Sequence, residues 1–189
     1  MKLRRPHLGR ALSVVLVAVV IAAAAVVWHD LPSPTDLYGP FDVDAPAGEQ
    51  ARGRAITATV TSVRIAARVD AVAAAGRWVV VDTTMAAVHS TELPHADLLV
   101  GPNTYAPTER FFFDTLRKPL APGITQRGSW VFDVAAPLVD PGAREPLTLR
   151  VWVGGDMLDS RLVIRIPADD PRISRTEAAG LTPPEESAR

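Results

Sequence analysis

The sequence predicts an antiparallel β-sandwich of about seven strands, preceded by one apolar helix. Two observations predict the sandwich: short runs alternate apolar and polar residues with a period of two, and turn residues separate these runs at regular intervals. No stretch between the runs has the spacing of a crossover helix, so consecutive strands are expected to pair antiparallel. The helix is predicted by one long uncharged segment near the amino terminus.

This uncharged segment spans residues 11–28 and reads ALSVVLVAVVIAAAAVVW. At about 1.5 Å per residue, a helix of this length rises roughly 27 Å, close to the ~30 Å hydrocarbon thickness of a bilayer. It lacks the polar face that a soluble helix keeps, so we expect a transmembrane anchor. Residues 1–10 carry four basic side chains and no acidic one, which places them in the cytoplasm and the remaining chain outside the cell.

A cleaved signal peptide is the alternative for the same segment. Small residues from Ala22 to Ala25 could supply a cleavage site behind the basic start. The apolar run continues through Trp28, an aromatic residue suited to the membrane interface, and this favours a retained anchor. Under both interpretations the following domain is exported, and the alternative product is a secreted protein.

Two polar segments flank the predicted sandwich. Residues 29–53 contain four prolines together with Asp, Ser and Gly, so we expect a semi-rigid acidic linker. Residues 168–189 contain three more prolines and almost no large apolar side chains, so we expect a disordered tail. Residues 54–167 remain for the folded domain, a length sufficient for one core.

The first predicted strands lie at the start of this domain. Residues 56–65 are β-branched, but their apolar parity changes, which predicts a β-bulge near Thr61 or Ser62. Residues 77–85 form the next strand, with Val79, Val81 and Met85 expected to face the core. Between the two strands, the alanine-rich residues 69–75 are expected to form a helical turn that ends at glycine.

Turn residues organise the second half of the domain. Residues 98–105 predict a short hairpin, and Pro122-Gly123 predicts a type II turn leading into the strand that contains Trp130. Residues 147–153 and 162–166 alternate as a second hairpin around a double glycine. Phe111 to Phe113 is a strand or a buried loop. The strand count is typical of an immunoglobulin-like sandwich, with a small barrel as the alternative.

Composition excludes several classes of function. The chain has no cysteine, so it holds no disulfide, no thiolate metal site and no cysteine nucleophile. Beyond the apolar segment the chain is mildly acidic, which excludes the basic footprint of a nucleic-acid-binding protein. No glycine-rich phosphate loop is present, and we expect no cofactor.

Several motifs resemble a bacterial family. A strand ending in Val-x-Val-Asp-x-Thr at residues 79–84, Tyr105, the Pro122-Gly123 turn and the run from Gly128 to Val134 are similar to a widespread exported domain of unknown function. The resemblance covers residues 55–167. It implies an anchored immunoglobulin-like sandwich similar to secreted immunoprotective antigens, and it implies no catalytic residue. The chain departs from the family at residues 86–89, where an asparagine is usual.

One loop carries a candidate metal site. His89, Glu92 and His95, with Asp97 nearby, have side chains suited to zinc. Their H-x-x-E-x-x-H spacing differs from that of zinc proteases, and Pro94 prevents a continuous helix from aligning both imidazoles. We favour a polar surface loop over a metal site here.

Other candidates are weighed against structural roles. Ser129 is not in a nucleophile elbow, and Asp82, Asp114 and Asp133 are expected to be ordinary strand or loop carboxylates. Trp78 and Trp152 have the parity of outward strand positions, which makes them candidates for an exposed binding patch. We favour the alternative that another layer or a loop covers them.

These observations together predict where the protein acts better than what it binds. We expect a single-pass membrane protein whose extracytoplasmic domain is a non-enzymatic binding or accessory module at the bacterial cell envelope. Its partner is expected to be another envelope protein. The alternatives are a secreted, antigen-like binder and a metal-dependent envelope enzyme that uses the loop from His89 to His95.

Overall fold

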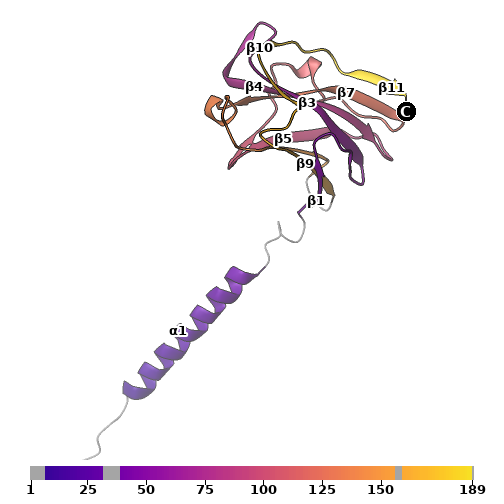
Figure 1. The fold of residues 1–189 in the computed structure, drawn as a ribbon. Helices are drawn as coiled ribbons and strands as arrows, with labels where there is room; N and C mark the ends of the chain where they lie inside the picture. Colours follow the sequence, from indigo (N-terminus) through magenta and orange to yellow (C-terminus); the bar gives the residue numbers. More distant parts are fainter. Residues whose placement is uncertain (1–6, 32–38, 156–158, 189) are drawn as a thin grey trace, which may run out of the picture. The chain divides into compact units, whose positions relative to one another are not determined.

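The structure is a computed structural model that describes residues 7–31, 39–155 and 159–188, and the chain divides into two compact units. The first unit contains helix α1 (His7–Asp30), drawn in indigo in Figure 1. Its segment Leu12–Asp30 has a mean hydropathy of 2.5, and none of it is buried by other parts of the chain. Of the described helices, it alone is long and apolar enough to cross a membrane. A signal sequence has the same properties.

The second unit, residues 39–189, consists of two stacked β-sheets (Figure 1). The first sheet has the strand order β1 (Phe41–Pro46), β9 (Ser160–Ile166), β8 (Leu147–Val153), β5 (Pro94–Val100) and β6 (Asn103–Tyr105). The second sheet has the strand order β10 (Ile173–Ala179), β3 (Ile56–Val69), β4 (Val72–Ala87), β7 (Ile124–Val134) and β11 (Glu185–Ala188), and the short β2 (Ala51–Arg52) also pairs with β3. The predicted β-sandwich is therefore confirmed.

Period-two alternation placed the core correctly. Every second residue of β8 is buried, and Val79, Val81 and Met85 of β4 lie in the cluster that fills the space between the sheets. The predicted bulge is also confirmed, because the pairing of β3 with β4 shifts register between Val60 and Ser62. The extra residue lets both halves of β3 turn their apolar side chains inward. Gly123 has a φ of 79°, as a type II turn requires at its third position.

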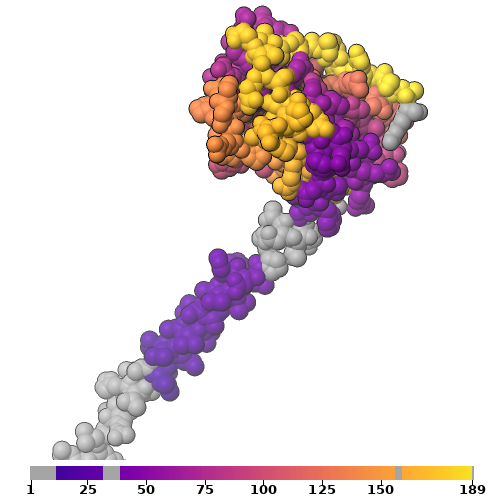
Figure 2. Space-filling view, in the orientation of Figure 1, coloured from indigo at the N-terminus to yellow at the C-terminus, as the bar shows by residue number. Residues whose placement is uncertain are grey.

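The expectation of a disordered tail is wrong. β10 pairs in parallel with β3, β11 pairs antiparallel with β7, and both belong to residues 168–189. Figure 2 shows these carboxy-terminal residues, in yellow, lying along the surface of the sandwich. An edge strand is held by backbone hydrogen bonds, which polar sequences form as readily as apolar ones, so composition alone did not show it.

The expectation of a linker over residues 29–53 is wrong for its second half. β1 pairs in parallel with β9, and Asp42 and Asp44 form ion pairs with Arg161 and Arg165 at 2.8 and 2.7 Å. Residues 29 and 30 belong to α1, and residues 32–38 lie outside the described residues. The described chain thus has eleven strands rather than seven, and two of the pairings are parallel.

The expected helical turn at residues 69–75 is also wrong. A two-residue turn joins β3 to β4, with Val69 paired to Val72 and Asp70 at a φ of 49°. Aspartate tolerates this left-handed conformation better than most residues, and the long strand pairing on both sides overrides the helix propensity of alanine. Gly76 is required where β4 approaches β7, because a Cβ there would lie 2.1 Å from the carbonyl oxygen of Val134.

Candidate functional site

The predicted metal loop does not assemble a metal site. In the described part of the chain, no group of three His, Cys, Asp or Glu side chains lies close enough to hold an ion. His89 is exposed, Glu92 accepts a hydrogen bond from Ser90, and His95 stacks on Trp152 with ring centroids 6.0 Å apart. Asp97 is bound to Arg150 instead. The side chains from His89 to His95 thus point to separate partners.

Trp78 is covered, as the favoured alternative stated, and does not belong to an exposed patch. It is 1% exposed and lies in a second apolar cluster on the outer face of the second sheet. Phe111 packs edge-on against it at 5.4 Å, and Ala179 from β10 joins the same cluster. The indole Nε1 donates to the carbonyl oxygen of Val72 at 3.0 Å. Trp78 is therefore a structural residue.

The hydroxyl of Ser129 belongs to a charge network beside a hollow of about 520 Å³ on the same outer face. Asp82 accepts hydrogen bonds from Ser129 at 2.7 Å, from Ser62, and from Arg64 at 2.7 and 3.0 Å. Because the guanidinium of Arg64 neutralises Asp82, that carboxylate is not a free base for Ser129. This network joins side chains of β3, β4 and β7.

Asp133 has a structural role of the same kind. Its carboxylate accepts the backbone N–H groups of Ala75 and Gly76 at 3.0 and 2.9 Å. These bonds hold the start of β4 against β7. Asp114 ends the short 3-10 helix Phe112–Asp114, on the crossover between the sheets. Asp82 and Asp133 therefore have partners that join neighbouring strands.

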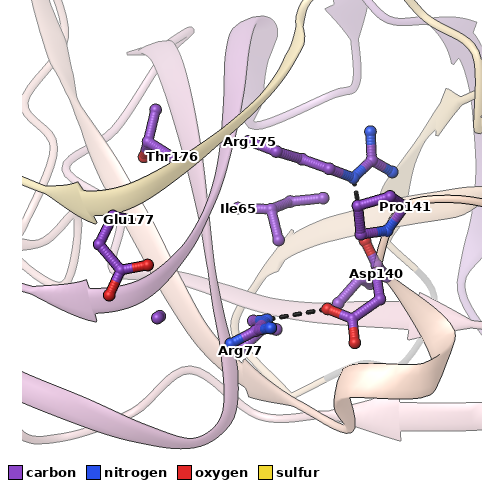
Figure 3. A pocket seen from close by; sticks show the side chains of 9 residues that line it. Ile65, Arg77, Asp140, Pro141, Arg175, Thr176 and Glu177 are labelled. Atoms are coloured by element: carbon purple, nitrogen blue, oxygen red, sulfur yellow. Dashed lines mark hydrogen bonds and ion pairs between the residues drawn. The ribbon is translucent and has the colours of Figure 1, made fainter.

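A smaller hollow of about 240 Å³ lies beside β10 (Figure 3). Arg77 and Asp140 face each other across it, with an ion pair of 2.8 Å, and Arg175 donates to the carbonyl oxygen of Val139 at 3.1 Å. Glu177 lies on the opposite side. Arg77, Asp140 and Arg175 thus already have partners within the chain. We therefore attribute this hollow to the packing of the carboxy-terminal tail against the sandwich.

A third hollow opens at the edge of the first sheet, and we call it the β5-edge cleft. It has a volume of about 400 Å³ and is lined by residues from five stretches of the chain, among them His95, Asp97, Pro107, Arg117, Trp130 and Trp152. β6 covers the edge of β5 along residues 98–100 only, and Leu120 pairs with Glu92 further back. The cleft is the uncovered stretch of β5 edge between these two neighbours.

Two buried donor atoms of residues that line this cleft make no hydrogen bond. The described residues contain three buried side-chain polar atoms without a hydrogen bond, and two of them are Nη1 of Arg117 and Nε1 of Trp130. Leaving a buried donor unpaired costs roughly 1–3 kcal/mol. Glu109 lies 3.8 Å from Arg117 Nη1 but is 87% exposed, so it neutralises the guanidinium weakly. Both residues line the cleft, and the two donor atoms lie buried behind its surface without a hydrogen bond.

The other charged groups of the cleft are paired. Asp97 and Arg150 form a two-pronged ion pair across β5 and β8, with Asp97 Oδ1 2.7 Å from Arg150 Nε. The stacked rings of His95 and Trp152 form a flat apolar rim beside this pair. This arrangement suits a ligand that has hydrogen-bond acceptor atoms and a flat or extended shape.

Sequence reasoning found part of this site. It named His95 and Trp152, for metal binding and for a patch respectively, but it missed Arg117 and placed Trp130 only in a strand. A sequence signal was present for Arg117. It lies four residues after the run Phe111 to Phe113, whose apolar side chains are not continued by the alternation of a strand. No signal showed that Trp130 would reach an opening, because its alternation is that of an ordinary core position.

Comparisons with known proteins add little beyond the fold. No family model matches this chain, and no curated protein matches it significantly. A solved structure described as an uncharacterized β-sandwich protein from Clostridium difficile 630 is similar, with 13% sequence identity and a TM-score of 0.44. The alignment covers 67% of this chain and 95% of that protein. The similarity extends to the β-sandwich fold alone.

Proposed function

We propose that this chain is a single-pass membrane protein whose β-sandwich is an extracytoplasmic, non-enzymatic binding module of the bacterial envelope. The observation that carries the binding role is the β5-edge cleft, where Arg117 and Trp130 each have a buried donor atom without a hydrogen-bond partner. Proteins satisfy nearly all buried polar groups, so two such donors in one opening indicate that a ligand completes them.

The anchoring part of the proposal is supported by α1. Its 19-residue segment Leu12–Asp30 has no Asp, Glu, Lys or Arg before the terminal Asp30, and its apolar side chains are not buried by the chain itself. Exposing such a surface to water is unfavourable, whereas a bilayer accommodates it. The basic residues before the helix orient the sandwich away from the cytoplasm.

We also propose that the sandwich is immunoglobulin-like, and the order of its strands supports this. Of the seven consecutive strands β3 to β9, the first, second and fifth lie in the second sheet, and the other four lie in the first sheet. Such an exchange of consecutive strands between two sheets is typical of Greek-key sandwiches. These folds carry binding sites on edges and loops, where the β5-edge cleft also lies.

Protease treatment of intact cells that express the full chain tests the location. We expect an externally added protease to degrade the sandwich without lysis, and a cytoplasmic control protein to survive. Protection of the sandwich until lysis would contradict the proposed orientation. Mass spectrometry of the mature amino terminus then distinguishes the anchor from the secreted alternative, since a cleaved chain would begin after the residues around Ala25.

The binding role is tested by titrating the full chain in detergent micelles with neutral, cationic and anionic small solutes. The indole N–H resonance of Trp130 reports on the cleft, and that of Trp78 reports on the covered face. We expect at least one class of solute to shift the Trp130 resonance and leave the Trp78 resonance in place. A Trp130 resonance that responds to no class would contradict a binding role for this cleft.

A further inference from the structure

We propose that the β5-edge cleft binds the carboxylate of a short, extended peptide. This inference rests on the proposed binding role and adds the chemical class of the ligand. It is carried by one juxtaposition: Arg117 and Trp130, each with a buried donor atom that makes no hydrogen bond, line the same cleft as a stretch of β5 that has no neighbouring strand.

The donors specify acceptors on the ligand. A guanidinium and an indole N–H can donate hydrogen bonds but cannot accept them, so the complementary group must offer acceptor oxygens or nitrogens. Both Arg117 Nη1 and Trp130 Nε1 are buried, and neither has a hydrogen-bond partner in the ranges that the structure describes. A carboxylate offers two oxygens and matches a guanidinium geometrically.

The charge of the cleft favours an anion. Asp97 is neutralised by the two-pronged contact with Arg150, so its carboxylate does not repel an incoming anion as a free one would. The neighbour of Arg117 is the exposed Glu109 at 3.8 Å, beyond hydrogen-bond distance. Arg117 also lies over the ring of Phe112 at 5.7 Å, which holds the guanidinium without cancelling its charge.

The backbone of β5 favours an extended peptide over an isolated anion. Residues of a strand turn their N–H and C=O groups alternately toward its two neighbours. Glu92 turns its backbone groups toward this edge, because it exchanges two hydrogen bonds with Leu120, of 3.0 and 2.7 Å. Val100 turns its own toward the same edge, because it pairs with Asn103 across a two-residue turn. By this alternation Pro94 and Ala96 turn toward the same edge, between these two partners.

The sequence of β5 agrees with this orientation. Proline has no N–H group and is confined to strand positions where no ladder hydrogen bond is needed. Pro94 therefore keeps the pairing with β8 intact while it faces the open edge. The backbone N–H of Ala96 remains for an added strand, as in peptide recognition by strand addition.

The size of the opening limits the ligand. A volume of about 400 Å³ lies near the lower end of the range for small-ligand pockets, about 300–1,000 Å³. The uncovered edge runs from Leu93 to Asp97, because Glu92 and Leu98 already have partners. A ligand of a few extended residues fits this length, and the stacked rings of His95 and Trp152 can support its side chains.

The experiment uses the full chain in detergent micelles with nitrogen-15 labels on its tryptophans. The probes are N-acetyl-tetraalanine with a free carboxyl terminus, the same peptide as its carboxyl-terminal amide, and acetate. The matched variants are Arg117→Gln, which removes the charge, and Trp130→Phe, which removes the N–H and keeps an aromatic ring. Arg110→Gln is the control, because Arg110 is exposed on the same crossover and does not line the cleft.

We expect the free acid to shift the Trp130 indole resonance and to bind at least about tenfold more tightly than the amide, as loss of a charge-assisted hydrogen bond predicts. Arg117→Gln should lower the affinity by a similar factor, and Arg110→Gln should leave it unchanged. In the Trp130→Phe variant the affinity, read by calorimetry, should fall severalfold. An unchanged Trp78 resonance shows that each variant that loses affinity is still folded.

Three outcomes overturn the inference. Equal binding of the acid and the amide contradicts the carboxylate. Acetate binding as tightly as the peptide acid contradicts the extended peptide and leaves an anion site only. No response to any carboxylate, when a solute of another class does shift Trp130, contradicts this ligand and leaves the proposed function standing; no response to any class contradicts both.

Discussion

The outer faces of the two sheets differ, although the same alternation builds both. On the second sheet, Trp78, Val80 and Val131 point outward and are still buried, because the crossover at Phe111 and the carboxy-terminal strand at Ala179 cover them. On the first sheet, the outward positions carry cross-strand ion pairs and a half-buried tryptophan. The outer face of the second sheet is thus covered around Trp78, whereas that of the first sheet faces solvent.

The difference shows that alternation predicts which side of a strand a residue occupies but not what lies over that side. Trp78 and Trp152 are both tryptophans, and both occupy outward-facing positions of their strands. One lies under two distant segments of the chain, and the other stacks on His95 at the surface. Substitutions at matched positions on the two faces can break or sharpen this comparison.

The largest expected difference is between the two tryptophans. Trp78→Ala removes a fully buried ring and should lower the free energy of unfolding by about 3–5 kcal/mol. Trp152→Ala removes a half-buried ring at the surface and should cost about 1 kcal/mol or less. Urea unfolding followed by circular dichroism measures both. Equal losses would show that the outer face of the second sheet is not covered in solution.

The next prediction concerns the carboxy-terminal tail. Ala179→Asp places a carboxylate in the cluster around Trp78, and we expect a loss of about 2–3 kcal/mol because the new charge is buried without a partner. The control is Ala178→Asp, at the preceding exposed position of β10. A tail that does not pack would tolerate both substitutions alike, and thermal melts of the two variants would then coincide.

A smaller difference is expected between two aspartates. Asp82→Ala leaves Ser62, Ser129 and the guanidinium of Arg64 without their shared acceptor, and should cost about 1–3 kcal/mol. Asp42→Ala on the first sheet breaks a pair whose carboxylate is 46% exposed, and should cost about 0–1 kcal/mol. Chemical denaturation at low and high salt checks this, since only the exposed pair is strongly screened. A larger loss at Asp42 than at Asp82 would reverse the comparison.

The smallest effect distinguishes the two buried indole groups. Trp78→Phe loses the hydrogen bond from Nε1 to the carbonyl oxygen of Val72, whereas Trp130→Phe removes an N–H that makes no hydrogen bond in the described structure. Both lose some packing, so we expect Trp78→Phe to be more destabilising by about 1 kcal/mol. Differential scanning calorimetry of the full chain measures the two midpoints. A Trp130→Phe variant that is the less stable of the two would mean that Nε1 of Trp130 is already satisfied.

Several elements could be read from the sequence because their cause is local. Alternation predicted β4, β7, β8 and β9, a change of parity predicted the bulge in β3, and Pro122-Gly123 predicted its turn. Each of these signals arises within about a dozen neighbouring residues. The charge-free run that forms α1 is equally local.

The edge strands could not be read in this way. β1, β10 and β11 are held largely by backbone hydrogen bonds, and these leave no apolar signature in the sequence. Their prolines and polar residues instead suggested a linker and a tail. The β5-edge cleft escaped for a related reason, because it is the part of an edge that β6 and Leu120 do not cover.

The sequence by itself determined one apolar helix, the alternating strands of a sandwich and the residues of its central core. Only the tertiary structure decided which outward faces are covered, that both ends of the sandwich domain add edge strands, and that Arg117 and Trp130 meet at an opening. The physical reason is range: side-chain alternation and turn chemistry act between near neighbours, whereas coverage, edge pairing and unpaired donors depend on segments that only folding brings together.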